Sequence, residues 1–157
     1  MRSLLLRNLF FTILQPGIVV GLIPYFILGE RIQIIFAQPL TTIQYMAAIV
    51  FLVGFLIMSH CIISFAVRGK GTLSPADPTK QLVIKGLYNY SRNPMYVGVL
   101  LMLLAQAFFF ESNTLWGYTL AVFIAFNFFI LFFEEPRLRK DFGAAYTAYS
   151  KKVRRWF

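Results

Sequence analysis

The stretch KQLVIKGLYNYSRNPMY, at positions 80–96, is the segment around which the rest of the chain is organised. It is polar and aromatic, and it lies between runs of almost pure hydrocarbon side chains. Backbone polar groups beside lipid must be satisfied within the protein, so we expect this segment to line a cavity or bind a ligand. Pro94 disfavours helix at the preceding residue and suits the first turn of a new helix. The segment is therefore predicted to be a loop that closes onto a helix N-terminus, which favours an anion.

The composition is that of an integral membrane protein. Of the 157 residues, 59% are hydrophobic and only 13% are charged, which is too apolar for an ordinary soluble domain. The formal charge of +9 raises the alternative of nucleic-acid binding. The basic residues, however, flank apolar runs and do not form a soluble face with interleaved aromatic residues, so no nucleic-acid partner is expected. Cys61 is the single cysteine, which excludes an internal disulfide.

Four apolar runs predict an all-α, polytopic membrane protein with about four transmembrane helices. The runs lie at about 4–28, 43–67, 96–110 and 115–133, and a helix of about 20 residues crosses a hydrocarbon core. Positions 30–42 are predicted to be a short polar connection, and positions 68–95 a long loop rich in turn residues. The whole chain, 1–157, is expected to form a single membrane domain.

A further, amphipathic helix is predicted at 136–155, because apolar residues recur there at steps of three and four. Its apolar face comprises Leu138, Phe142, Tyr146, Tyr149, Val153 and Trp156. Basic residues such as Arg139 and Lys152 lie on the opposite face, a pattern suited to the membrane surface.

The distribution of Lys and Arg predicts that both termini and the long loop are cytoplasmic. With four spans in this orientation, Arg31 alone of the lysines and arginines falls on the outer side. The compact length and the absence of retention signals suggest a prokaryotic inner membrane.

Two smaller features leave alternatives open. Gly17 and Gly21 share a helix face that a neighbouring helix of the same chain, or less favourably a second copy, can approach closely. The oligomeric state is therefore undecided. His60 and Cys61 point about 100° apart on a helix, so no metal site is expected. His60 is expected to hydrogen-bond within the bundle, and lining the site is its less favoured role.

Glu134 and Glu135 follow the last apolar run and are the candidate acidic groups. Two carboxylates beside hydrocarbon are costly unless they are paired or bind a cation. In one alternative they pair with the basic residues that follow: Arg137, Arg139 and Lys140. In the other, one carboxylate holds an amino group of a ligand.

The loop would complete such a ligand site with aromatic rings. Tyr88, Tyr90 and Tyr96 offer faces that attract a sulfonium or ammonium ion. From the residues alone, the prediction is a ligand site that faces the cytoplasm in a small helical membrane protein.

Two motifs extend this interpretation. LV-x-x-G-x-Y-x-x-x-R-[HN]-P-x-Y occupies positions 82–96, and EE-x-x-L-x-x-x-FG-x-x-Y-x-x-Y occupies positions 134–149, after a hydrophobic hairpin. In this order and spacing they resemble the isoprenylcysteine carboxyl methyltransferase family, whose relatives include the phospholipid N-methyltransferases. The resemblance covers roughly the last half of the chain. It implies a membrane methyltransferase that uses S-adenosylmethionine and acts on a lipophilic or lipid substrate.

The resemblance also implies which residues would form the site. The cofactor-binding residues would be Lys80, Gln81, Leu82, Val83, Gly86, Tyr88, Asn93, Pro94, Met95, Tyr96 and Glu134. The candidate catalytic residues are Arg92, Asn93, Tyr96 and Glu135. Glu134 would be the acidic ligand of the cofactor, with Glu135 in support. Arg92 is expected to orient an anionic group of cofactor or substrate, or else to contact lipid headgroups.

Departures from that family bear on the substrate. The eukaryotic prenylcysteine enzymes have histidine at the positions of Lys80 and Asn93, and arginine at the position of Ile130. Without that arginine a prenylcysteine carboxylate lacks its partner. Methyl transfer to a carboxylate or thiolate is favoured, because these nucleophiles need no general base. The alternatives are a phospholipid N-methyltransferase and a non-catalytic membrane binding or assembly subunit.

Overall fold

The structure, a computed structural model, describes residues 16–64, 82 and 84–156. All the regular elements in these residues are helical, which confirms the all-α prediction for this part of the chain. In order they are η1 (Gly17–Leu22), α2 (Ile23–Leu28), α3 (Arg31–Phe36), α4 (Thr42–Ser64), η3 (Gly86–Asn89), α5 (Pro94–Phe109), α6 (Asn113–Phe129), η4 (Ile130–Glu134) and α7 (Glu135–Lys152). Parts of the predicted run 4–28 and of the predicted loop 68–95 lie outside the described residues.

Two helices of the described part are long and apolar enough to cross a membrane. They are α4, with 23 residues, and the helical stretch Asn113–Lys152, with 40 residues, which comprises α6, η4 and α7. The segment η1–α2 and α5 are also apolar but shorter. The predicted runs at 43–67, 96–110 and 115–133 therefore coincide with helices, while a count of four crossings stays a prediction.

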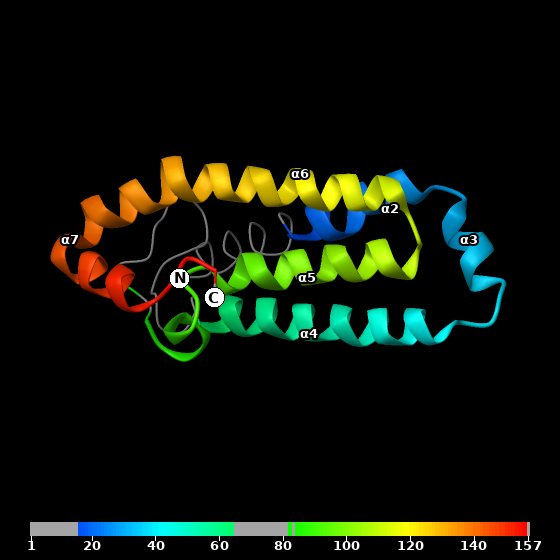
Figure 1. Cartoon of the computed structure of the whole chain (residues 1–157), viewed down its shortest axis with the longest axis horizontal. Coiled ribbons are helices and arrows are strands. Elements are labelled where there is room, and N and C mark those ends of the chain that lie inside the picture. Colours follow the sequence, from blue (N-terminus) through cyan, green and yellow to red (C-terminus); the bar gives the residue numbers. More distant parts are fainter. Residues whose placement is uncertain (1–15, 65–81, 83, 157) are drawn as a thin grey trace, which may run out of the picture.

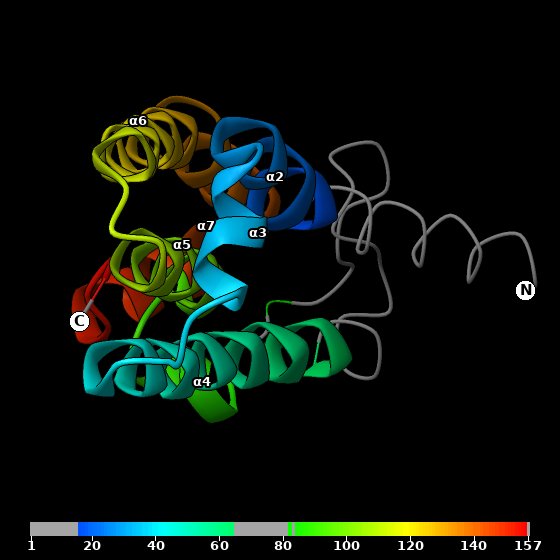
Figure 2. The same ribbon diagram turned by 90° about the vertical axis from the view of Figure 1, so that its right-hand side faces the viewer.

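Helices α4, α5 and α6 lie side by side, with α5 in the middle (Figures 1 and 2). The tightest contact joins α4 to α5: a Cβ added at Gly98 would lie 2.7 Å from the Gly54 carbonyl oxygen. Two glycines thus let the helix backbones touch. At Gly17 and Gly21, which the sequence suggested for this role, an added Cβ meets no described atom within 4 Å.

Local signals explain where α5 and α6 begin. Pro94 is in the first turn of α5, as predicted. Ser112 caps α6, because its Oγ accepts a hydrogen bond from the Leu115 N–H at 3.4 Å. Pro94 thus marks where α5 begins, and Ser112 marks where α6 begins, shortly after α5 ends.

The predicted polar connection at 30–42 contains a short helix that the sequence did not indicate. Arg31–Phe36 forms α3. No proline interrupts this stretch, because the next proline after Pro24 is Pro39. Ile32 packs against a cluster that contains Leu28, Ala107 and Leu115. Burial of an apolar side chain therefore stabilises a helix that is too short to persist alone.

The structure differs from the predicted amphipathic surface helix at 136–155 in how the helix begins and in where its apolar face lies. The helix runs on from η4 without a break, because the Glu135 N–H bonds to the Ile130 carbonyl in a wide turn just before Pro136. At Gly143 (φ 49°, ψ −121°) the chain then bends sharply, a conformation that favours glycine. Figure 1 shows the last part of α7 folding back. Its apolar residues Tyr146 and Tyr149 are buried against Leu82, not exposed.

Candidate functional site

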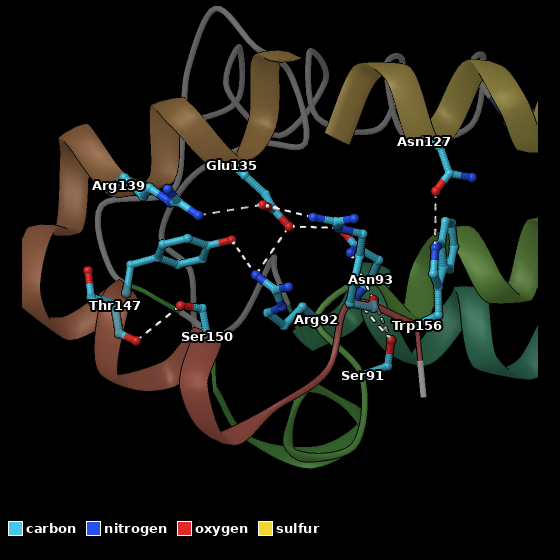
Figure 3. A network of polar contacts seen from close by, with 11 residues as sticks. Ser91, Arg92, Asn93, Asn127, Glu135, Arg139, Thr147, Ser150 and Trp156 are labelled. Carbon is cyan, nitrogen blue, oxygen red and sulfur yellow. Dashed lines mark hydrogen bonds and ion pairs between the residues drawn. The ribbon is translucent and has the colours of Figure 1, made fainter. Parts of the chain in front are cut away.

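The polar residues of both sequence motifs meet at one end of the helix bundle (Figure 3). Three segments converge there: residues 91–93 before α5, the start of α7, and residues 153–156 after α7. They are far apart in sequence, and the bend at Gly143 returns the third segment to the other two. The structure thus brings together the two motifs that the sequence singled out.

Glu135 is the centre of an ion-pair network. Its Oε1 lies 3.1 Å from Arg92 Nη1 and accepts a hydrogen bond from Arg155 Nε at 2.8 Å. Arg155 Nη2 donates to Oε2 at 3.2 Å, which makes the Arg155 contact bidentate. The Arg139 guanidinium approaches Oε2 at 3.9 Å. Glu135 is only 6% exposed, so this carboxylate is largely removed from water.

The charges around Glu135 determine its protonation. Burial raises its pKa, but the Arg155 hydrogen bond and the charges of Arg92, Arg155 and Arg139 outweigh burial and hold the pKa below its usual range. In turn the hydrogen bond to Glu135 raises the pKa of Arg155. Glu135 is therefore a carboxylate that arginines keep ionised, and this favours a structural ion pair over a proton acceptor.

Glu134 has a different environment from its neighbour. Its Oε2 accepts a hydrogen bond from the Tyr96 hydroxyl at 2.9 Å. Within the described ranges no arginine or lysine forms an ion pair with Glu134 at 4.0 Å or less. The Tyr96 ring also packs on Phe126, with centroids 4.6 Å apart. Of the two alternatives that the sequence left open, pairing with arginine describes Glu135, whereas Glu134 contacts the Tyr96 hydroxyl.

Arg92 is held from two sides. Its Nη1, besides pairing with Glu135, donates to the Tyr146 hydroxyl at 3.2 Å. Its Nε is buried and has no hydrogen-bond partner among the described residues. A buried donor without a partner is costly, so this N–H is suited to an acceptor supplied by a ligand.

Tyr88 is buried in η3 beside Cys61 and the partly buried Met95. Burial raises its pKa well above the usual range, and the neighbouring Cys61 and Glu134 add to this effect. The Tyr149 hydroxyl donates to the Tyr88 carbonyl at 2.6 Å. This hydrogen bond joins η3 to the last part of α7.

The remaining residues of the predicted site have varied positions. Gly86 has a positive φ of 69° and begins η3. Tyr90 is 75% exposed, so of the three tyrosine rings proposed to face a cation it is the least enclosed. Pro94 is buried at the start of α5. Three of the predicted cofactor residues lie outside the described part of the chain: Lys80, Gln81 and Val83.

Asn93 contacts another part of the chain. Its Nδ2 donates to the Arg155 carbonyl at 3.0 Å, and the same carbonyl accepts from Ser91 Oγ at 3.3 Å. His60 is exposed and its neighbour Cys61 buried. Among the described residues no group of three or more metal-ligating side chains forms.

Sequence reasoning missed the partners Arg155 and Asn127. Arg155 is one of several basic residues near the end of the sequence, and nothing in the pattern distinguishes it. The sequence could have indicated Asn127, because it is the only amide in the apolar run 115–133. A polar side chain in such a run needs a hydrogen-bond partner. The Trp156 indole N–H donates to the Asn127 Oδ1 at 3.2 Å.

Comparison with known families identifies the kind of protein. Residues 42–145, about two thirds of the chain, match the phospholipid methyltransferase family. No curated protein and no solved structure matches the chain. The matched family is the one named in the sequence resemblance as a relative, and the finer assignment to the isoprenylcysteine enzymes is not confirmed. With the apolar helices, the match indicates a membrane methyltransferase that acts on a membrane lipid. The chain belongs to the phospholipid methyltransferase family.

Proposed function

We propose that the protein transfers the methyl group of S-adenosylmethionine to the amine headgroup of a membrane phospholipid, at a site on the cytoplasmic side. The observation that carries the proposal is the Glu134 carboxylate, which accepts a hydrogen bond at 2.9 Å from the hydroxyl of Tyr96, the last residue of the motif at 82–96. Among the described residues no arginine forms an ion pair with it within 4.0 Å, in contrast to Glu135.

The side chains present fit such a cofactor. S-adenosylmethionine carries an ammonium, a carboxylate and a sulfonium. When bound, it would supply the sulfonium methyl group, which passes to a nucleophile as the S–CH3 bond breaks and the neutral thioether leaves. Glu134 would hold the ammonium, and the Tyr96 hydroxyl orients its carboxylate. The buried Arg92 Nε lacks a described acceptor and would hold the carboxylate together with the N-terminus of α5. These residues act by positioning and by charge, which can supply most of the acceleration of a transfer reaction.

The family and Ile130 together favour a phospholipid amine as the nucleophile. Ile130 is fully buried, at 0% exposure, and stands where the prenylcysteine enzymes have an arginine for their substrate. An aliphatic side chain inside the protein gives a carboxylate substrate no cation at that position. The family match supports a phospholipid. We therefore place the amine before the carboxylate or thiolate that the sequence alone favoured.

A lipophilic carboxylate is the second candidate. Arg92 supports it, because its unpartnered Nε would also orient an anionic nucleophile. The two nucleophiles differ in their dependence on pH. An amine must lose its proton before it attacks, so its rate rises with pH below the amine pKa, whereas a carboxylate is ionised throughout the neutral range.

The test is methyl transfer in vesicles that contain the full chain and radiolabelled S-adenosylmethionine. Vesicles with a primary-amine phospholipid should give labelled lipid, and vesicles of choline phospholipid alone, which has no free amine, should not. Label in a lipophilic carboxylic acid added to the choline vesicles, with none in the amine lipid, would favour the second candidate.

Calorimetric binding of S-adenosylmethionine tests the site itself. Glu134→Gln should weaken binding by about 1.5–3 kcal/mol, the range for a hydrogen bond to a charged group. Tyr96→Phe should weaken it by about 1 kcal/mol. Glu111→Gln, which removes an exposed carboxylate beyond the far end of α5, is the matched control. No binding by a folded parent protein would favour a non-catalytic membrane subunit.

A further inference from the structure

The segment after α7, residues 153–156, contacts both the residues before α5 and the helices α6 and α7. We call this segment the strap. Val153 is 9% exposed and packs in a cluster with Tyr146 and Tyr149. The chain leaves the helix at Val153 in an extended conformation. The strap is therefore a non-helical segment, with bends at Val153 and Arg155, that lies beside the residues drawn in Figure 3.

Main-chain atoms of the strap bind the motif directly. The Arg92 N–H donates to the Arg154 carbonyl at 3.0 Å. The next carbonyl, that of Arg155, accepts from both Ser91 Oγ and Asn93 Nδ2, at 3.3 and 3.0 Å. Ser91 Oγ also accepts from the Asn93 N–H at 3.1 Å. Each of the three residues before α5 is thus hydrogen-bonded to the strap.

Side chains of the strap hold it to the helices on either side. Arg155 makes the bidentate contact with Glu135 at the start of α7. Trp156 reaches α6, where its N–H donates to Asn127 and its ring lies 5.4 Å from that of Phe123. Asn127 is polar in an apolar helix. The indole N–H therefore gives its Oδ1 a hydrogen-bond donor that lipid would not provide.

These contacts converge on the residues that would meet the cofactor. Ser91, Arg92 and Asn93 lead into Pro94 and the first turn of α5, where Tyr96 contacts Glu134. A shift of residues 91–93 would move the Arg92 guanidinium and the N-terminus of α5 together. Misplacement by about 1 Å at such a point is enough to impair transfer strongly.

We propose that the strap positions the cofactor site, with Arg155 and Trp156 as its positioning residues. Neither side chain needs to touch the cofactor. Arg155 acts by anchoring its own carbonyl against Ser91 and Asn93, and Trp156 acts by fixing the strap to α6. This inference rests on the proposed function, because it concerns the binding of S-adenosylmethionine at the same site.

The experiment compares four variants of the full chain in detergent. Arg155→Ala should raise the Kd and the KM for S-adenosylmethionine about tenfold or more, with a much smaller change in kcat. Arg155→Lys should recover part of this loss, and Trp156→Phe should raise Kd about threefold. Arg154→Ala is the matched control, because that side chain is exposed and its carbonyl remains; its Kd should stay within twofold of the parent value.

A second readout follows the strap without any cofactor. In a Trp116→Phe background Trp156 is the one remaining tryptophan, so its fluorescence reports on the strap. Arg155→Ala should make this fluorescence more accessible to quenching by acrylamide. Greater quenching with an unchanged Kd would overturn the proposal, since the strap would then be loose without effect on the site. Unchanged quenching would overturn it too, since Arg155 would not hold the strap.

The two proposals fail in different ways. A folded parent that neither binds S-adenosylmethionine nor transfers a methyl group overturns the proposed function, and the strap proposal with it. A parent that binds and transfers normally, beside an Arg155→Ala protein with the same Kd and KM, overturns the strap proposal alone. A lower melting temperature of Arg155→Ala with parental Kd and KM would show a purely structural role and would also count against it.

Discussion

Replacing Glu135 with glutamine is expected to lower the free energy of unfolding by about 3 kcal/mol. Glu135 is 6% exposed and the Arg92 side chain 12%, so the change leaves a buried guanidinium without its anion. Breaking a buried ion pair from one side costs about 3–5 kcal/mol. The low end applies here, because Arg155, with 30% of its side chain exposed, can turn to water. Glutamine also retains one oxygen that accepts a hydrogen bond.

The assay is unfolding of the full chain by denaturant in mixed micelles, followed by far-ultraviolet circular dichroism. Arg139→Ala is the control, because it removes a guanidinium that is 65% exposed and 3.9 Å from the same carboxylate. An exposed pair of this kind contributes about 0–1 kcal/mol. If Glu135→Gln costs no more than Arg139→Ala, the Arg92–Glu135 pair is not shielded from water and the reasoning is refuted.

Three further outcomes follow from the geometry. Gly98→Ala should cost about 1–3 kcal/mol in the same unfolding assay, because the new methyl meets the Gly54 carbonyl at 2.7 Å; Gly117→Ala, with open space at its Cβ, should cost nothing. Since arginines hold the pKa of Glu135 below its usual range, the stability it contributes is present above its unfolded pKa of about 4.3 and is lost as pH falls through the lower folded pKa; a Glu135→Gln protein with an equally steep acid loss would contradict this. The rate with amine phospholipid at low lipid concentration should rise with pH from about 6 to 9, as the amine loses its proton; a flat profile would argue for an anionic nucleophile.

The sequence predicts those parts of the fold that depend on local chemistry. Pro94 marks the start of α5 because a proline fits a first helical turn, and Ser112 caps α6 because its hydroxyl reaches the N–H of Leu115. The helix α3 has no such signal. It forms because Ile32 packs on residues of α2, α5 and α6, and that contact is invisible until the chain is folded.

The amphipathic pattern after Glu135 shows a second limit. The spacing of Tyr146, Tyr149 and Val153 correctly identifies a shared apolar face, but it does not say what the face covers. Gly143 decides this, because its positive φ turns the chain back over the loop. From sequence, a glycine within a helical pattern predicts only that the helix is less stable at that position. The direction of the bend depends on the partner that the apolar face finds, here Leu82.

The candidate site was predictable in its residue types and not in their pairing. Glu134, Glu135, Arg92 and Tyr96 stand out in sequence as polar residues beside hydrocarbon, and the structure places all four at one end of the bundle. Which glutamate meets the arginines depends on the direction of each side chain. Arg155, the closest partner of Glu135, is 20 residues away and meets it only because of the bend at Gly143.

Helix geometry explains why two adjacent carboxylates have separate roles. Side chains of neighbouring residues point about 100° apart on a helix, so Glu134 and Glu135 cannot both face the arginines. Glu135 faces Arg92 and Arg155, and its charge is used to fix the segment before α5. Glu134 faces Tyr96, and in the proposed function its carboxylate holds the ammonium of the cofactor. Glu135 thereby fixes the backbone near Tyr96, the partner of Glu134, because Arg92 and Tyr96 are only four positions apart across Pro94. Loss of Glu135 should therefore weaken cofactor binding through the position of Arg92, while loss of Glu134 should weaken it directly and leave the unfolding free energy nearly unchanged.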